Sequence, residues 1–362
     1  MDVMVSPSVQ ELAPMLRAML DGDRSGPLAV IADPARLSAI TQSLEGVDII
    51  LGTSGSTDGT GHLVGLSLDA LTASATATHA RLGGPGQWLA TLTADHVAGF
   101  QLAFRSALAG TTPIGISRWD DPGELRAALE SRTPGVPLYA SYVPAQLRAL
   151  IETAPDLLAR LDAVLIGGAA MPEPLAIRAA AAGIRVVRTY GMTETGGGCV
   201  YDGVPLDGVQ VRIEGVRVEL GGTTLMTRYL DTEIQPFVRD GARRWLTTAD
   251  LGRRREDGRI EVLGRADDVI VSGGVNVPPR VVEDCLEAAF GGAWAVLGVP
   301  DERWGQRVVA VTETPGFSLD NVRSATSHLG PAFQPREIAV GQLPRTALGK
   351  LDRRALREQL GA

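Results

Sequence analysis

The first half of the chain alternates between apolar stretches of two kinds. Residues 9–20 carry apolar side chains at helical spacing, whereas Leu28–Ala32 and Val47–Leu51 are short continuous apolar runs typical of buried strands. The alternation continues with helix 68–82, strand 88–93, helices 97–109 and 122–132, strand 138–141, helix 144–152, strand 163–166, helix 173–182 and strand 185–190. This order predicts βαβ units, and therefore an α/β fold with a mostly parallel sheet covered on both faces.

The pattern changes twice further along. From about residue 208, short alternating segments separated by glycines predict an appended antiparallel β element. Its predicted strands are Val209–Ile213, Val216–Leu220 and Thr224–Met226. After residue 268 a third pattern predicts helix 278–289, strands 293–299 and 307–313, helix 319–329 and a last helix from 352. We therefore predict a large domain over residues 1–265 and a small, mobile α+β lid domain over residues 266–362.

Composition excludes several classes of function. The formal net charge of −8 argues against a nucleic-acid-binding surface, and the arginine runs at 243–244 and 253–255 alternate with acidic and apolar residues. The two cysteines, Cys199 and Cys285, lie far apart without metal-ligand spacing, so neither a disulfide framework nor a zinc site is indicated. No apolar run approaches bilayer length. We predict a cytoplasmic protein with small-molecule substrates, no nucleic-acid partner and no membrane span.

A polar loop, Thr53–Gly61, follows the predicted strand at 47–51. Its hydroxyl groups and unhindered backbone amides are the groups that wrap phosphate oxygens. A polar surface turn has the same composition, so this loop alone leaves both interpretations open. It lacks the Gly-Lys-Ser/Thr ending of the Walker P-loop, which excludes an ordinary P-loop nucleoside triphosphatase.

A second segment, Thr189–Gly198, also lies at the end of a predicted strand. In open α/β sheets, ligands bind beyond the carboxyl ends of the strands, so both loops can face one crevice. Glu194 could bind a hard cation through oxygen, Thr193 could donate to a phosphate, and Tyr190 could stack on a base. Most tyrosines and glutamates on turns have no such role, but three consecutive glycines follow here, which favours a site.

Taken with four further segments, these loops resemble the ANL superfamily of acyl-CoA synthetases and non-ribosomal adenylation domains, over about residues 50–357. The ordered segments that carry the resemblance are Thr53–Gly59, Leu165–Ala169, Tyr190–Glu194, Thr248–Gly252, Gly264–Asp268 and Pro344–Lys350. Each is weak alone, whereas their order is specific. The resemblance implies an enzyme that uses ATP and Mg²⁺ to activate a carboxylate as an acyl-adenylate and then transfers the acyl group to coenzyme A.

The resemblance also implies roles for individual residues. It assigns nucleotide and coenzyme A contacts to Thr53, Ser54, Gly55, Ser56, Thr57, Gly168, Ala169, Tyr190, Gly191, Asp250, Arg265, Gly273 and Gly274. Glu194 would hold the magnesium ion, Thr193 would contact phosphate, Asp267 would be the hinge, and Lys350 would be the catalytic lysine. Without the resemblance, Lys350 would be interpreted as an exposed lysine before a helix.

The acyl pocket is the least defined part of this assignment. His96 matches the position of the family's pocket gate and is expected to act both in catalysis and in substrate binding. Ser141, Gln146 and the glycines Gly196 and Gly197 are expected to line the same cleft. A lone histidine is more often structural than functional, and that alternative stays open for His96.

Two features depart from the superfamily pattern. The chain has Gly61-His62 where the family usually has a lysine, with Asp58 as an apparent insertion, and a histidine is only partly protonated at neutral pH. Only about 50 residues precede the phosphate loop, fewer than in most family members. This short front end, with the runs at 71–75, 81–86 and 198–208, resembles short actinobacterial o-succinylbenzoate–CoA ligases of menaquinone biosynthesis.

That closer resemblance implies formation of o-succinylbenzoyl-AMP followed by thioester formation with coenzyme A. Three alternatives stay open: a ligase for another aryl or short-chain acid, a non-catalytic adenylate-binding relative suggested by His62, and an adenylation domain that serves a separate carrier protein. A homodimer is compatible with each of these, although no sequence pattern predicts it.

Overall fold

The computed structural model describes residues 1–53, 61–346 and 351–361. Contacts between residues divide the chain into two compact units, and each unit is made of three separate stretches of the chain. The first unit comprises Met1–Gly168, Ala179–Arg212 and Glu219–Thr248. The second comprises Ala169–Arg178, Ile213–Val218 and Ala249–Ala362. The predicted domain boundary after residue 265 stays a prediction.

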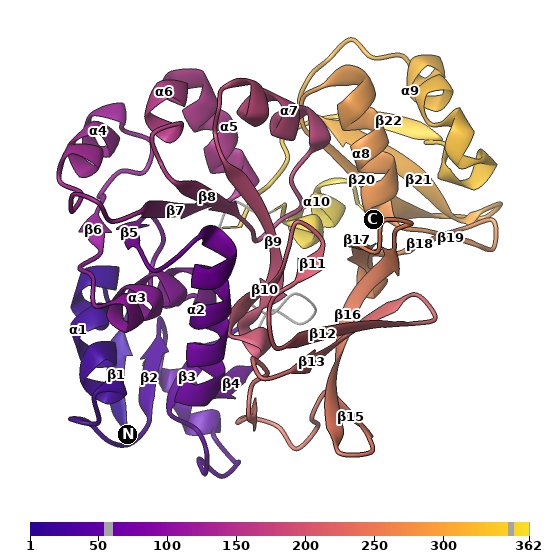
Figure 1. The fold of residues 1–362 in the computed structure, drawn as a ribbon. Coiled ribbons are helices and arrows are strands. Elements are labelled where there is room, and N and C mark those ends of the chain that lie inside the picture. The colour runs from indigo at the N-terminus through magenta and orange to yellow at the C-terminus, as the bar shows by residue number, and fades with distance from the viewer. Residues whose placement is uncertain (54–60, 347–350, 362) are drawn as a thin grey trace. The chain divides into compact units, whose positions relative to one another are not determined.

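Two mixed sheets form the framework of the first unit, and Figure 1 labels all of their strands except β14. The first sheet has the order β1-β2-β3-β4-β14 and the second has the order β11-β10-β9-β8-β7-β5-β6. Their strands are β1 (Asp2–Val5), β2 (Leu28–Ile31), β3 (Ile49–Gly52), β4 (Leu63–Leu66), β5 (Gln87–Ala90), β6 (Ile114–Gly115), β7 (Leu138–Tyr142), β8 (Ala163–Ile166), β9 (Val186–Met192), β10 (Gly197–Tyr201), β11 (Val204–Pro205) and β14 (Arg228–Tyr229).

Helices connect these strands, as the alternating sequence pattern predicted. They are α1 (Val9–Leu20), α2 (Leu68–Leu82), α3 (Val97–Ala109), α4 (Pro122–Glu130), α5 (Pro144–Thr153), α6 (Pro155–Leu158) and α7 (Glu173–Ala181). Helix α1 begins where predicted because Ser8 caps it: the Ser8 hydroxyl accepts from the Glu11 N–H, and the Glu11 carboxylate accepts from the Ser8 N–H. Helix α3 is buried over most of its length, since it contacts α1, α2, β5 and β10.

An antiparallel sheet contributes residues to both units, because the division falls inside three of its strands. Its order is β12-β13-β16-β15, with β17 paired to β16. The strands are β12 (Val209–Glu214), β13 (Arg217–Gly222), β15 (Phe237–Asp240), β16 (Arg243–Arg254) and β17 (Ile260–Arg265). This sheet confirms the predicted appended antiparallel element.

The second unit contains its own sheet, with the order β19-β18-β21-β20 and with β22 beside β21. The strands are β18 (Ile270–Ser272), β19 (Val275–Val277), β20 (Trp294–Asp301), β21 (Gly305–Thr312) and β22 (Glu337–Val340), and the helices are α8 (Pro279–Phe290), α9 (Leu319–Ala325) and α10 (Arg353–Gln359). One apolar cluster, including Val282 and Leu286 of α8, covers one part of this sheet. A second cluster contains Leu343 and, from α10, Leu356.

The α/β fold class is confirmed, with two local corrections. The sheets of the first unit are parallel in part only, since β4, β14, β10 and β11 add antiparallel pairs at their edges. The predicted strand at Thr224–Met226 is wrong: a turn at Thr224 is followed by two residues that belong to no helix or strand. Its polar groups have other partners, because the Met226 N–H donates to the Glu194 carbonyl and Arg244 donates to the Met226 carbonyl.

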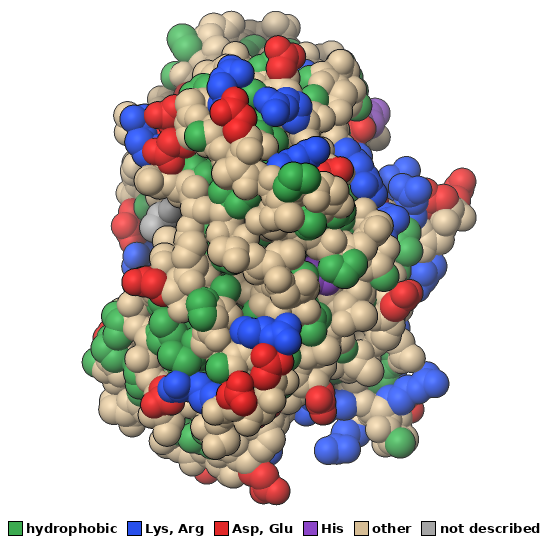
Figure 2. Space-filling model, turned by 60° about the vertical axis from the view of Figure 1, so that its left-hand side comes forward, with side chains coloured by type: hydrophobic (Ala, Val, Ile, Leu, Met, Phe, Trp, Pro, Cys, Tyr) green, Lys and Arg blue, Asp and Glu red, His purple; other side chains and the backbone are tan. Residues whose placement is uncertain are grey.

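Surface charges follow the mixed composition. On the face shown in Figure 2, acidic and basic side chains lie interspersed.

Within the described parts of the chain, no helix combines the length and apolar character needed to cross a bilayer.

Candidate active site

Four neighbouring strands of the second sheet bring predicted site residues to one sheet edge. β5, β7, β8 and β9 run parallel to each other in the first unit, so their carboxyl ends lie at the same edge. The positions at or just beyond these ends are His96 after β5, Ser141 in β7, Gly168 after β8, and Tyr190 and Gly191 in β9. This is the edge at which open α/β sheets bind ligands.

The turn after β9 presents Glu194. Thr193, Glu194 and Thr195 form a single 3₁₀ turn, which ends at Gly196. Thr195 fixes this turn from inside, since its hydroxyl accepts from the Met192 N–H at 3.0 Å and donates to the Gly197 carbonyl at 2.7 Å. Thr193 and Thr195 are buried, whereas Glu194 is half-buried and can reach a bound group.

Two glycines at the end of this turn have backbone conformations that favour a residue without a side chain. Gly196 and Gly197 have φ values of +61° and +105°, in the left-handed region that favours glycine. The Gly196 carbonyl accepts from Ser74 of α2 at 3.3 Å and also from Gln101 of α3. The helices of the first unit therefore hold the glycine turn that was predicted to line the acyl pocket.

Gly191 is closed in by the same turn. A Cβ atom at Gly191 would lie 2.1 Å from the Gly197 carbonyl oxygen and 2.7 Å from the Gly198 Cα atom, both of them backbone atoms of the paired strand β10. We expect Gly191→Ala to destabilise the protein by about 1–3 kcal/mol, the usual cost of overpacking. Thermal unfolding measures the effect, and Gly341→Ala is the matched control because a Cβ there meets nothing within 4 Å. Equal melting temperatures for the two variants would contradict this tight packing.

The other predicted pocket residues have contacts of their own. His96 is half-buried and occupies the position before the first turn of α3, without capping it through its side chain. The Ser141 carbonyl accepts from the Thr91 hydroxyl at 2.5 Å. The side-chain carbonyl of Gln146 accepts from the Val143 N–H at 2.9 Å, so this oxygen caps α5. Their roles in substrate binding stay predictions.

Only the base of the predicted phosphate loop is described. Ser54, Gly55, Ser56 and Thr57 lie outside the described residues. Thr53 and His62 close the loop through two hydrogen bonds: the His62 N–H donates to the Thr53 hydroxyl at 2.7 Å, and the Thr53 N–H donates to the His62 carbonyl at 2.8 Å. His62 then leads directly into β4.

Side chains connect this loop base to Glu194 within the first unit. The His62 ring stacks on the Tyr229 ring with centroids 4.3 Å apart. The Tyr229 hydroxyl donates to Glu194 Oε1 at 2.7 Å. Two segments that are distant in sequence, the base of the predicted phosphate loop and the Glu194 turn, are therefore joined through β14.

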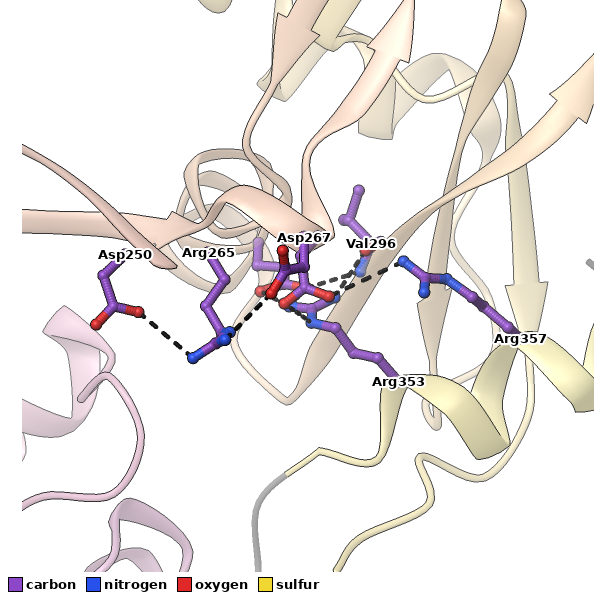
Figure 3. A network of polar contacts seen from close by, with 8 residues as sticks. Asp250, Arg265, Asp267, Val296, Arg353 and Arg357 are labelled. Carbon is purple, nitrogen blue, oxygen red and sulfur yellow. Dashed lines mark hydrogen bonds and ion pairs between the residues drawn. The ribbon is translucent and has the colours of Figure 1, made fainter. Parts of the chain in front are cut away.

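The second unit places Asp250 and Arg265, two residues predicted to contact the nucleotide or coenzyme A, together. Asp250 of β16 and Arg265 of β17 are direct partners in the antiparallel ladder, and Arg265 Nη1 lies 3.8 Å from Asp250 Oδ1. Arg265 Nη2 lies 3.1 Å from the carboxylate of the predicted hinge residue, Asp267. Figure 3 shows Arg265 between these two carboxylates. Asp250 is buried, and its role in nucleotide binding stays a prediction.

The remaining predicted residues of this unit are only partly described. Gly273 and Gly274 have φ values of +59° and +76°, and the Gly273 N–H donates to the Trp304 carbonyl at 2.8 Å. Ala169 belongs to this unit and is exposed. Lys350 lies outside the described residues. On either side of its segment, Arg345 and Leu351 form an antiparallel bridge.

Sequence reasoning missed four residues that hold this site. They are Ser74, Gln101, Tyr229 and Asp231. Ser74 and Gln101 gave a weak signal, because each is a polar residue at a buried position of a mainly apolar helix. Tyr229 and Asp231 gave no signal in the sequence, since their partners Glu194 and His62 come from segments far away in the sequence.

Comparison with known proteins places the chain in a family. The model of the AMP-binding enzyme family matches residues 29–224. The chain is 43% identical to a probable 2-succinylbenzoate–CoA ligase of Mycobacterium tuberculosis, over 95% of this chain and 94% of that protein. It is 32% identical to a 2-succinylbenzoate–CoA ligase of Bacillus cereus, over 75% of this chain and 61% of that protein.

Solved structures share the fold. The o-succinylbenzoate–CoA synthetase of Bacillus subtilis in complex with its acyl-adenylate intermediate superimposes with a TM-score of 0.76 at 23% identity, covering 98% of this chain and 82% of that one. The same synthetase with ATP and a magnesium ion gives a TM-score of 0.75 at 24% identity, covering 99% and 84%. From the family match and the near full-length relative, the chain belongs to the AMP-binding enzyme family.

Proposed function

We propose that the chain is an AMP-forming o-succinylbenzoate–CoA ligase of menaquinone biosynthesis. The observation that carries this proposal is the 43% identity to the Mycobacterium tuberculosis relative over nearly the full length of both chains. The relatives at 43% and 32% identity are named a probable 2-succinylbenzoate–CoA ligase and a 2-succinylbenzoate–CoA ligase. We also propose a cytoplasmic location and a homodimer. Light scattering measures the mass of the particle in solution and therefore tests the homodimer.

The reaction has two steps. In the first, a carboxylate oxygen of the acid attacks the α-phosphorus of ATP, the bond to the β-phosphate oxygen breaks, and pyrophosphate leaves. In the second, the thiolate of coenzyme A attacks the acyl carbonyl carbon, the bond to the AMP oxygen breaks, and AMP leaves. Both reactants of the first step are anions, so the protein must neutralise charge and align them.

Nucleotide contacts are proposed for residues of both units, each from its own motif. Tyr190 would lie against the adenine, and Thr53 and Thr193 would donate to phosphates. Asp250 would accept from the two ribose hydroxyls, a bidentate contact suited to a carboxylate, with Arg265 beside it. The Arg265 contacts to Asp250 and Asp267 support this role, because they tie the ribose position to the proposed hinge.

The donor set also fits magnesium. Among the described residues, no group of three or more His, Cys, Asp or Glu side chains is arranged to hold a metal. Magnesium is usually held by one or two carboxylates together with substrate phosphates, so the single carboxylate of Glu194 suits it. When bound, the ion would neutralise phosphate charge during the first step.

The proposed lid motion would separate the two steps. Lys350 would enter the site for adenylate formation and leave it when coenzyme A reacts, with Asp267 as the hinge and with Gly273 and Gly274 beside the thiol path. A first test omits coenzyme A. The purified protein with ATP, Mg²⁺ and o-succinylbenzoate should release pyrophosphate and retain an acyl-adenylate detectable by mass spectrometry. ATP binding without an adenylate from any acid would favour a non-catalytic relative instead.

A further inference from the structure

Tyr229 is placed to hold the candidate metal ligand. Its hydroxyl donates to Glu194 Oε1 at 2.7 Å. The carboxylate oxygen can only accept, so the phenol is the donor in this hydrogen bond. One oxygen of Glu194 is fixed in this way, which orients the other.

The backbone of Tyr229 is also fixed. It pairs with Val64 in the short ladder between β14 and β4. Gln235 closes a loop onto it: the Tyr229 N–H donates to the Gln235 side-chain oxygen at 2.8 Å, and the Gln235 side-chain nitrogen donates to the Tyr229 carbonyl at 3.1 Å. The phenol is therefore carried by a rigid segment.

His62 and Asp231 support Tyr229 on the side of the phosphate loop. The His62 and Tyr229 rings lie 29° from parallel, in a stacked arrangement. His62 Nδ1 lies 3.3 Å from Asp231 Oδ1, and the other carboxylate oxygen of Asp231 accepts from the Leu63 N–H at 3.1 Å. Asp231 thus holds both the ring and the backbone of the segment that follows the loop.

A metal held by one protein carboxylate depends strongly on how that carboxylate is oriented. Partners in the outer shell of metal sites typically change metal affinity by about 10–100-fold when they are removed. We propose that Tyr229 is a positioning residue that orients Glu194 for the magnesium ion of bound Mg·ATP, and that His62 and Asp231 hold Tyr229 in place. This inference rests on the proposed function, because it takes Mg·ATP as the ligand.

The proposal changes the interpretation of His62. The sequence suggested that a histidine replaces a cationic lysine near the phosphates. In the structure, its ring contacts an aromatic ring and a carboxylate instead. The role assigned here depends on the flat ring of His62 and does not require a charge.

Tyr229→Phe tests the hydroxyl alone, since it keeps the ring that stacks on His62. We expect the Mg²⁺ concentration for half-maximal AMP formation to rise by about 10-fold, with kcat at saturating Mg²⁺ within about 3-fold of wild type. Titration calorimetry should show Mg·ATP binding weakened by a similar factor and metal-free ATP binding unchanged. Tyr139→Phe is the matched control, because it removes one buried tyrosine hydroxyl that donates to the Gly84 carbonyl in the same unit.

The calorimetric result separates this inference from the proposed function. If wild type binds ATP in a Mg²⁺-dependent manner and Tyr229→Phe binds equally well, the positioning role is overturned and the ligase proposal stands. If wild-type ATP binding does not depend on Mg²⁺, both fail. Equal losses in Tyr229→Phe and Tyr139→Phe would assign the effect to general stability and would also overturn the positioning role.

Two replacements of His62 distinguish a role in holding the Tyr229 ring from a role as a cation near the phosphates. His62→Phe retains a flat ring against Tyr229 and loses the contact with Asp231, whereas His62→Lys retains a cation and loses the ring. We expect His62→Phe to raise the Mg²⁺ requirement by about 3-fold, and His62→Lys to raise it by about 10-fold. The opposite order would overturn the assigned support and make His62 a phosphate-binding cation.

Discussion

Replacing Lys350 with alanine is expected to slow adenylate formation by about 10²–10³-fold, the usual cost of losing one charged donor at a developing negative charge. Thioester formation from supplied acyl-adenylate should stay near the wild-type rate, because Lys350 would act only in the first step. Rapid-quench measurement of each half-reaction gives both rates. Equal losses in the two steps would contradict the proposed lid motion.

Lys350 offers a second and independent test. Among the 34 lysine and arginine residues of the chain, it is the only lysine. Every other basic position uses arginine, whose planar guanidinium suits bidentate ion pairs, whereas the ammonium of lysine is a compact charge on a flexible stem. An amine-directed acetylating reagent would therefore reach only Lys350 and the chain's α-amino group. Treated wild type should lose adenylation as the Lys350→Ala variant does.

The treated Lys350→Ala variant is the control for that experiment, because it reports modification of the α-amino group alone. Its residual activity should not change on treatment. Wild-type protein that carries one acetyl group on Lys350 and keeps full adenylation activity would exclude Lys350 as the catalytic cation.

Replacing Arg353 with methionine should have the largest effect on stability, about 3–5 kcal/mol, since it leaves a buried charge without its partner. Arg353 Nη2 lies 2.7 and 2.9 Å from the two oxygens of Glu283, whose side chain is 4% exposed. Its Nη1 donates to the Val296 carbonyl, and Nε lies 3.5 Å from Asp268. Figure 3 shows Arg353 reaching from α10 into this cluster.

Hydrogen exchange of α8 and α10 measures this change within the second unit. Arg357→Met is the matched control: it lies on the same helix, its side chain is 41% exposed, and it stands 3.9 Å from Asp268. An exposed pair of this kind contributes about 0–1 kcal/mol. If both variants exchange alike, the Arg353 cluster is not the anchor of α10.

The same cluster allows a double-variant check. Glu283→Gln removes the charge but keeps an oxygen for the Val296 N–H, which donates to Glu283 at 2.8 Å. Added to Arg353→Met, it should restore part of the lost stability, because the unpaired buried charge is then gone.

Much of the fold followed from local patterns. Continuous apolar runs located β2, β3 and β8, and helical spacing located α1 and α3 within about a residue. The strand at Thr224–Met226 failed because three residues carry too little periodicity to separate a strand from a turn. Besides β3, β4 pairs with β14, a strand of two residues that no pattern predicted.

Motifs predicted candidate site residues singly, and their pairing was not predictable. Glu194, Asp250 and Arg265 stay predicted site residues, whereas the contact of Glu194 with Tyr229 and the contact of Asp250 with Arg265 depend on strand register. Register is set by side-chain packing between distant segments, which one sequence does not reveal. His62 is the clearest example, since its departure from the family pattern was visible and its ring contact was not.

The central claim is that this chain joins o-succinylbenzoate to coenzyme A through an adenylate. The most direct measurement incubates the purified protein with ATP, Mg²⁺ and coenzyme A, and with o-succinylbenzoate or one of a panel of benzoates and short fatty acids. Mass spectrometry then quantifies each acyl-CoA thioester and AMP. We predict o-succinylbenzoyl-CoA and AMP in equal amounts, with the other acids converted far more slowly. Thioesters formed only from other acids would contradict the substrate, and the absence of any thioester would contradict the ligase itself.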